Sequence, residues 1–178
     1  MDGREYIERL LGYDDAESAV RADMPRLLTV IPELRDTVGF EHRHPHHHKD
    51  VWEHTLLALS FSKNQLVTRL ALLLHDVGKP TCCQQEGEIR HFRGHPRRSA
   101  ELAEAILCRL GFDRALSDRV TELVRRHDTP LSKKDIARDP ELSAELFEVQ
   151  RCDALAHDPS HNERRMKYIE EIRRELKI

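Results

Sequence analysis

The sequence has few aromatic residues, few cysteines and no long hydrophobic run. Aromatic side chains make up only 5% of the 178 residues, so we expect a core built mainly from Leu, Ala and Val. The N-terminus lacks the apolar segment of a signal peptide, and no apolar run approaches the length of a membrane span. These absences predict a cytoplasmic protein without a membrane partner.

The cysteines exclude two further classes of protein. Cys82 and Cys83 are adjacent, Cys108 and Cys152 are distant from them, and no pair has the C-x-x-C spacing. A zinc knuckle or a disulfide framework needs such paired spacings. We therefore expect free thiols in a reducing compartment.

The chain also lacks a basic surplus. Its net charge of -3 at pH 7 argues against duplex DNA as the main partner, because proteins that bind duplexes usually carry a basic face. A nucleotide or an RNA end remains compatible with this charge. The charged fraction of 34% and the hydrophobic fraction of 39% fit a soluble helical protein, and the length fits one domain.

The hydrophobic pattern predicts an all-α protein. Gly12 and Gly111 should end two of its helices, because Gly readily adopts the left-handed conformation at a helix C-terminus. Between residues 81 and 94 the helical pattern is lost, which predicts a small irregular loop or hairpin. We expect a single helical bundle in which N-terminal helices within residues 1–39 pack on a core of residues 40–178. The main helices are expected at residues 4–11, 51–61, 64–76, 96–110, 113–127, 140–157 and 162–177, with a polar link before residue 140.

The stretch from Leu72 to Pro80 carries the most informative motif. An apolar helical run delivers His75 and Asp76 side by side, and Gly78 and Lys79 follow. Neighbouring side chains on a helix diverge by roughly 100°, so His75 and Asp76 can approach one point from two directions. A buried imidazole and a buried carboxylate both need partners, and a shared metal ion would satisfy both.

Other polar residues occupy positions where the helical pattern expects core residues. A single His on an apolar face is usually a core residue with satisfied hydrogen bonds, and this simpler interpretation applies to each one separately. Several of them in one small bundle would each need a buried partner of its own, whereas one metal centre satisfies them together. The candidate metal ligands are His54, His75, Asp76, His95, His127 and Asp153.

These motifs resemble a known family. His54, then His75-Asp76, then Asp153 are similar to the H…HD…D signature of the HD-domain metal-dependent phosphohydrolases. The similarity covers roughly residues 40–157, and no nucleotidyltransferase or tRNA-binding region precedes it, so we expect an HD module on its own. The segments that most resemble the HD domain of bacterial tRNA nucleotidyltransferases are Val51-Trp52-Glu53-His54-Thr55-Leu56, His75-Asp76-Val77-Gly78-Lys79 and Phe92-Arg93-Gly94-His95.

The resemblance implies a ligand set and a cofactor. The four signature residues would surround a first metal, and Asp76 would bridge it to a second metal that His95 and His127 also bind. The implied cofactor is a pair of divalent ions per chain, drawn from Mn, Fe, Co, Ni, Zn and Mg. Imidazole and carboxylate ligands suit such ions, and the absence of Cys from the set disfavours a structural zinc site.

The implied function is a metal-dependent phosphohydrolase, either a phosphomonoesterase or a phosphodiesterase, acting on a nucleotide-like phosphate ester through a metal-activated water or hydroxide. Asp76 and Lys79 are the expected catalytic residues, with Lys79 binding a phosphate oxygen. Alternatively, Lys79 is an exposed cation near a helix C-terminus. Two other functions remain open: an RNA-end 2′,3′-cyclic phosphodiesterase or phosphatase, and a non-catalytic module that senses a metal or a nucleotide. Monomer and homodimer are both compatible with the sequence.

Residues around the motif are candidate substrate contacts. Arg93, Arg97 and Arg98 flank His95, and guanidinium groups suit phosphate oxygens, although a solvated charged face is the competing explanation. His48 stands before His54, where the resembling family also has a His, so we expect it to contact substrate.

The remaining histidines carry no firm prediction. His42, His44, His46 and His47 are interpreted as surface residues or adventitious metal binders. His157 lies one helical turn after Asp153 and could support the ligands. His91 and His161 have no expected role.

Overall fold

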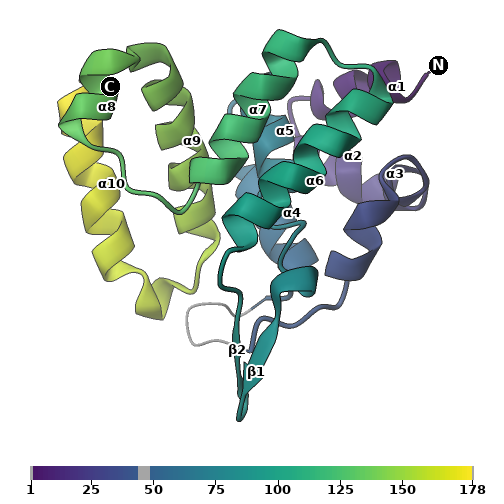
Figure 1. Cartoon of the computed structure of the whole chain (residues 1–178), viewed down its shortest axis with the longest axis horizontal. Helices are drawn as coiled ribbons and strands as arrows, with labels where there is room; N and C mark the ends of the chain where they lie inside the picture. The colour runs from purple at the N-terminus through teal and green to yellow at the C-terminus, as the bar shows by residue number, and fades with distance from the viewer. Residues whose placement is uncertain (1, 44–48, 178) are drawn as a thin grey trace.

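Helices make up nearly all of the regular structure, and one small hairpin projects from the bundle (Figure 1). The structure is a computed structural model, and it describes residues 2–43 and 49–177. The elements in chain order are α1 (Gly3–Leu11), α2 (Ala16–Ala22), α3 (Met24–Val30), the 3-10 helix η1 (Pro32–Thr37), α4 (Val51–Ser60), α5 (Leu66–Leu74), η2 (Pro80–Cys82), β1 (Gln84–Glu86), β2 (Ile89–His91), α6 (His95–Leu110), α7 (Arg114–Arg126), α8 (Lys133–Arg138), α9 (Pro140–Ala156), η3 (Pro159–His161) and α10 (Glu163–Leu176). The all-α prediction is confirmed.

Helix starts follow simple capping rules. Asp15, Asp50 and Asp113 each accept a hydrogen bond from the backbone N–H three residues further on, which satisfies a donor that the first turn of a helix leaves unpaired. Gly111 ends α6 with a φ of 80°, as predicted. Gly12 ends α1 with a φ of -82°, so the prediction of a left-handed conformation at this residue is wrong. Its N–H bonds the Arg9 carbonyl instead and closes the turn without a positive φ.

The expected loop or hairpin near residues 81–94 is an antiparallel hairpin. Gln84 pairs with His91 and Glu86 with Ile89, and Gly87 makes the turn with a φ of 62°. The polar link predicted before residue 140 contains a helix, α8, whose cap Ser132 exchanges hydrogen bonds with Asp135. That helix is short and mostly exposed, so the hydrophobic pattern did not reveal it.

Helix α5 occupies the centre of the bundle and contacts α1, α4, α6, α7 and α9. Its residues from Leu70 to Leu74 are all buried, as expected for a helix surrounded by others. The helix is shorter than the predicted range 64–76, because Gln65 is still extended and the regular helix ends at Leu74. His75 and Asp76 therefore lie in the turn just beyond its C-terminus.

The N-terminal helices cover one side of this bundle, with α1 against α5 and α2 against α4 (Figure 1). At the other side α10 packs along α9. The core is aliphatic, and Tyr6, Trp52, Phe112 and Phe147 are the aromatic side chains in its main cluster. Among the described residues, no helix is both long enough and apolar enough to span a membrane.

Candidate metal centre

The polar residues predicted from the sequence meet at one end of the bundle. His54 comes from α4, His75 and Asp76 follow α5, and His95 begins α6. The other two residues are His127, which caps the C-terminus of α7, and Asp153, which lies in α9. All six side chains are buried. Helices that are distant in sequence therefore bring together every predicted ligand.

Asp76 lies at the middle of this cluster. Its Oδ2 is 3.2 Å from His75 Nε2 and 3.9 Å from His54 Nε2. Its Oδ1 is 3.2 Å from His95 Nε2 and 3.8 Å from His127 Nε2. The two carboxylate oxygens thus face two different pairs of imidazoles, and Asp76 belongs to two of the three groups of potential metal ligands among the described residues.

Asp153 lies beside the first of these pairs of imidazoles. Its Oδ1 is 2.9 Å from His54 Nε2 and 3.7 Å from His75 Nε2. Burial alone would raise the pKa of a carboxyl, but the neighbouring His157 and His54 hold the pKa of Asp153 well below its usual value. Asp153 is therefore a carboxylate and able to bind a cation.

Backbone carbonyls fix the orientation of the histidines. Nδ1 of His75 lies 2.7 Å from the Leu72 carbonyl, and Nδ1 of His127 lies 2.7 Å from the Val124 carbonyl. His54 and His95 make the same kind of bond, to Ala156 and Phe92. A carbonyl can only accept, so each Nδ1 carries the proton and each Nε2 is left to face the centre. This arrangement is the one that metal-binding imidazoles commonly show.

Several central atoms lack the partners that burial demands. Asp76 Oδ1 and Nε2 of His75 are buried without a hydrogen bond of suitable geometry, whereas Asp76 Oδ2 forms an ion pair with Lys79 Nζ at 2.7 Å. His95 Nε2 and His127 Nε2 are 3.2 Å apart, and two neutral rings oriented by their Nδ1 protons would point lone pairs at each other. A cation relieves both problems, so the residues present fit a divalent metal.

The carboxylates also act on His75. Burial opposes its protonation, yet the charges of Asp76 and Asp153 outweigh that penalty and raise the pKa of His75 to about 10. Burial would raise the pKa of Asp76 as well, but His75 and Lys79 hold it well below the usual value. In the absence of a metal, the proton on His75 and the Lys79 ammonium therefore offset the negative charge of Asp76 and Asp153.

Lys79 is not the exposed cation that one interpretation of the sequence allowed. It is only 5% exposed, and its Nζ lies 2.7 Å from Asp76 Oδ2. Nζ also donates to Nε2 of His42 at 3.0 Å, while Nδ1 of His42 donates to the Lys49 carbonyl. The interpretation of His42 as a surface residue is wrong, because it is buried beside the centre and fixes Lys79 there.

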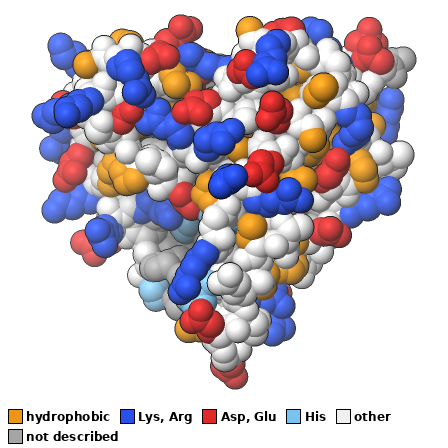
Figure 2. Space-filling view, viewed as in Figure 1, with side chains coloured by type: hydrophobic (Ala, Val, Ile, Leu, Met, Phe, Trp, Pro, Cys, Tyr) orange, Lys and Arg blue, Asp and Glu red, His pale blue; other side chains and the backbone are white. Residues whose placement is uncertain are grey.

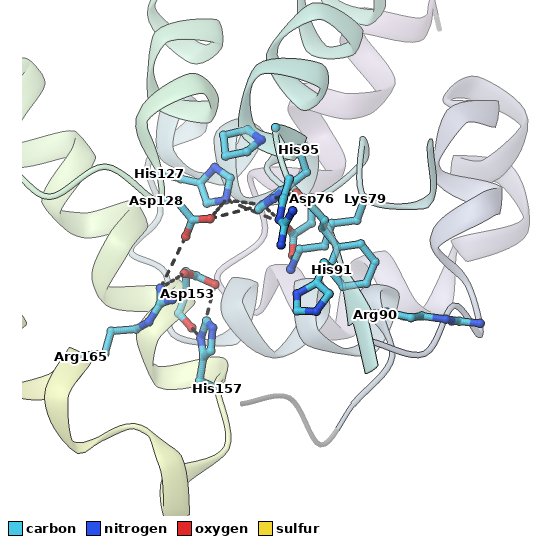
Figure 3. Close-up of a pocket in the computed structure, with 14 residues that line it drawn as sticks. Asp76, Lys79, Arg90, His91, His95, His127, Asp128, Asp153, His157 and Arg165 are labelled. Carbon is cyan, nitrogen blue, oxygen red and sulfur yellow. Dashed lines mark hydrogen bonds and ion pairs between the residues drawn. The ribbon is translucent and has the colours of Figure 1, made fainter. Parts of the chain in front are cut away.

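The sequence did not predict Asp128 or Arg165 at this site, whereas His157 was already expected to support the ligands. Asp128 follows His127 directly, and its Oδ2 is 3.5 Å from His95 Nε2. His157 is buried and forms a third potential ligand group with His54 and Asp153. Arg165 of α10 reaches Asp153 Oδ2 at 2.9 Å (Figure 3). The adjacent His127 and Asp128, and the spacing of four residues from Asp153 to His157, were weak indications of these two residues in the sequence. No pattern indicated Arg165.

The predicted substrate contacts are only partly near the centre. Arg93 lines the cavity beside the metal residues, whereas Arg97 and Arg98 pair with Glu101 on the exposed face of α6 and do not line it. His48 lies outside the described residues, together with His44, His46 and His47. Of the arginines in the hairpin region, Arg90 also lines the cavity, but its guanidinium packs over the Phe40 ring and extends away from the cluster (Figure 3).

The cavity at the centre has a volume of about 380 Å³ and is open to solvent. Its walls come from the turn after α5, the hairpin region, α9 and α10. In Figure 2, histidine atoms reach the surface in the lower part of the molecule, above the tip of the hairpin. Because the cavity is open to solvent, a small ligand can reach the cluster from outside.

Comparison with known proteins agrees with this architecture. The family model of the HD domain matches residues 46–158, which include His54, the His75-Asp76 pair and Asp153. That match covers more than half of the chain. The chain belongs to the HD domain family.

Characterised relatives indicate a more specific similarity. The chain is 37% identical over 139 residues to the CC-adding tRNA nucleotidyltransferase of Thermus thermophilus, covering 71% of this chain and 32% of that protein. It is 34% identical over 180 residues to the A-adding tRNA nucleotidyltransferase of Deinococcus radiodurans, covering 90% of this chain and 40% of the relative. A multifunctional CCA protein of Alkalilimnicola ehrlichii is 38% identical over 105 residues, which cover 57% of this chain and 25% of that protein. The chain thus spans well under half the length of these relatives.

Proposed function

We propose that this protein is a metal-dependent phosphohydrolase that cleaves a nucleotide-like phosphate ester. The observation that carries the proposal is Asp76, whose two oxygens face two separate pairs of imidazoles with their Nε2 atoms turned inward. The HD family supports the reaction class, and the open cavity beside Asp76 gives a phosphate ester access to it.

The residues divide into two potential metal sites that share Asp76. His54, His75 and Asp153 would hold one divalent ion with it, and His95 and His127 would hold the other. When bound, such ions activate water for attack on phosphorus and offset the charge of the phosphate oxygens. Asp128 and His157 border these groups and are further candidates to stabilise them.

The chain itself supplies the remaining electrostatics. Lys79 lines the cavity and is held there by Asp76 and His42. Its positive charge can stabilise negative charge on a phosphate oxygen. Arg165 stands on the opposite side against Asp153, and Arg93 lies at the exposed rim. A phosphate bound in the cavity would lie between these cations.

An RNA-end substrate is the second candidate, and the relatives favour it. Two of the relatives are named as tRNA nucleotidyltransferases, so tRNA is the substrate that their names give. By that analogy the ester would be a 2′,3′-cyclic or terminal phosphate on RNA. A module that binds metal or nucleotide without turnover is the third candidate.

The products of hydrolysis distinguish these functions. A phosphomonoesterase releases inorganic phosphate, whereas a cyclic phosphodiesterase opens the ring to a 2′- or 3′-monophosphate and releases none. The purified protein would be assayed with nucleoside monophosphates, 2′,3′-cyclic nucleotides and an RNA oligonucleotide ending in a 2′,3′-cyclic phosphate, with Mn, Ni, Co, Mg or EDTA. We expect turnover that requires a metal and is lost in Asp76→Ala but kept in Asp36→Ala, since Asp36 is an exposed residue remote from the centre. Equal activity of both variants, or no turnover of any compound by a metal-loaded protein, would reject the hydrolase.

A further inference from the structure

A second cavity adjoins the metal centre. Its volume is about 450 Å³, and it lies between α10, α9 and the link that follows α7. It shares His127, Asp128, His157 and Arg165 with the first cavity, so one molecule can occupy both. Most of its other lining residues follow residue 158, where the match to the HD family model ends.

The polar groups deep in this second cavity are already paired. The Tyr168 hydroxyl donates to Gln150 Oε1 at 2.7 Å and accepts from the Leu131 N–H at 2.8 Å. The amide nitrogen of Gln150 donates to the carbonyls of Arg126 and Thr129. The Tyr168 hydroxyl and the Gln150 amide are therefore used in hydrogen bonds within the protein. Tyr168 presents mainly its ring to a ligand.

The two cavities therefore differ in chemistry. Around the first lie the metal ligands, Lys79 and Arg93, which suit an anion. The second has Tyr168, Pro130 and Ile169 in its lining, and its polar lining residues include Gln150, Asn162 and the exposed His161 and Arg164. Aromatic rings and guanidinium planes are surfaces on which nucleobases stack. Arg165 stands at the junction, 2.9 Å from Asp153 and 3.8 Å from Asp128 (Figure 3).

The wall of the second cavity is fixed in place. Asn162 is buried at the start of α10 and donates its side-chain N–H to the Ala154 carbonyl of α9. The Tyr168 hydroxyl ties the middle of α10 to the link after α7. A pocket held at both points is preformed, so a ligand that fits it does not have to order the helix first.

We propose that this second cavity is a nucleoside subsite, which holds the base and sugar of a nucleotide whose phosphate lies at the metal centre. The inference rests on the proposed function and names the part of the substrate that α10 recognises. A ligand with a flat, mostly apolar end and an anionic end matches the change in chemistry from one cavity to the other. In this arrangement Arg165 lies where base and phosphate join.

Binding of unphosphorylated nucleosides tests the subsite without requiring turnover. Arg164→Trp would fill the cavity from an exposed position, and Lys167→Trp would place the same side chain on an exposed position of α10 that lines neither cavity. Adenosine and cytidine would be titrated into wild type and both variants, with binding followed by calorimetry. We expect at least tenfold weaker binding to Arg164→Trp than to wild type or Lys167→Trp. Equal binding by all three proteins, or no binding by wild type, would overturn the subsite.

Hydrolysis then separates this inference from the function on which it rests. Wild type and the two variants would be compared on a nucleoside monophosphate and on glycerol phosphate, which has no base. We expect kcat/KM of Arg164→Trp to fall at least tenfold for the nucleotide and to stay unchanged for glycerol phosphate. An equal fall for both esters would overturn the subsite. If nucleosides bind as expected but wild type cleaves neither ester, the subsite stands and the hydrolase is rejected.

Discussion

Lys79 Nζ lies 2.7 Å from Asp76 Oδ2 and donates to His42 Nε2 at 3.0 Å, so a buried cation is fixed beside the central carboxylate. His42 reaches this position from 37 residues earlier in the chain. The contact joins the segment before α4 to the turn after α5. It makes Lys79 a fixed part of the centre.

Replacing Lys79 tests whether this cation serves the reaction. Lys79→Met keeps most of the side-chain stem and removes the charge. The kcat for hydrolysis of the phosphate ester should therefore fall about a hundredfold, as is typical when one preorganised donor is lost. Metal content should be kept or increased, because the lysine no longer competes for Asp76. Steady-state kinetics and elemental analysis of the purified variant measure both effects. Lys167→Met, at an exposed position of α10, is the control, and unchanged kinetics in Lys79→Met would remove Lys79 from the mechanism.

Metal binding should release protons. The carboxylates of Asp76 and Asp153 overcome the effect of burial and raise the pKa of His75 to about 10, so in the metal-free protein this imidazole is protonated at neutral pH. A metal binds only the neutral ring, so it must displace that proton. One displaced proton makes affinity rise about tenfold per pH unit below that pKa.

Calorimetric titration with Mn at pH 6.5 and pH 8, in buffers of different ionisation enthalpy, measures this release directly. The number of protons released should drop in a His75→Ala variant, whereas His161→Ala, which alters an exposed histidine of η3, should behave as wild type. Affinity that does not change with pH would show that His75 is neutral before the metal arrives.

Helical periodicity revealed the six candidate ligands because each occupies a core position of an amphipathic helix or a turn at its end. His54 and Asp153, for example, interrupt apolar stripes, and that interruption is visible in sequence. The helices themselves were predictable for the same reason. Their ends were less so, since α5 stops at Leu74 and leaves His75 and Asp76 in a turn.

Residues that reach the centre through tertiary packing were not predictable. His42 lies among polar neighbours in the sequence, so the hydrophobic pattern does not predict that it is buried beside Lys79. Arg165 lies on a highly charged helix, and periodicity does not say which of its arginines faces α9. The pairing of Arg97 and Arg98 with Glu101 also depends on which face of α6 meets solvent.

Arg69 should be a major source of stability. It is only 1% exposed, and its guanidinium donates to the carbonyls of Leu11, Tyr13 and Asp14, which ties the N-terminal helices to α5. In Arg69→Met these acceptors lose their donor, so the free energy of unfolding should fall by about 3 kcal/mol. Urea denaturation followed by circular dichroism measures it.

The matched control for Arg69 is Arg9→Met, which changes an exposed arginine of α1 and should alter the free energy of unfolding by less than about 0.5 kcal/mol. A similar small effect in Arg69→Met would mean that packing of α1 and α2 holds the N-terminal helices without this cation.

Gly78 should be required for the geometry of the metal centre. A Cβ at this position would lie 2.6 Å from the backbone nitrogen of Ser99, so the turn that carries Asp76 and the first turns of α6 can approach only without a side chain. Gly78 also donates its N–H to Ser99 Oγ at 3.0 Å. Gly78→Ala should push α6 and His95 away from Asp76, weakening metal binding and lowering the free energy of unfolding by about 2 kcal/mol.

Gly87→Ala separates this effect from the general cost of losing a glycine. Gly87 lies at the hairpin turn with a φ of 62° and open space around it, so the alanine there should cost about 1 kcal/mol of backbone strain and leave metal affinity unchanged. Denaturation and Mn titration of both variants give the comparison. If Gly78→Ala binds metal as tightly as Gly87→Ala, then α6 can retreat without moving His95, and the close approach at Ser99 does not position the centre.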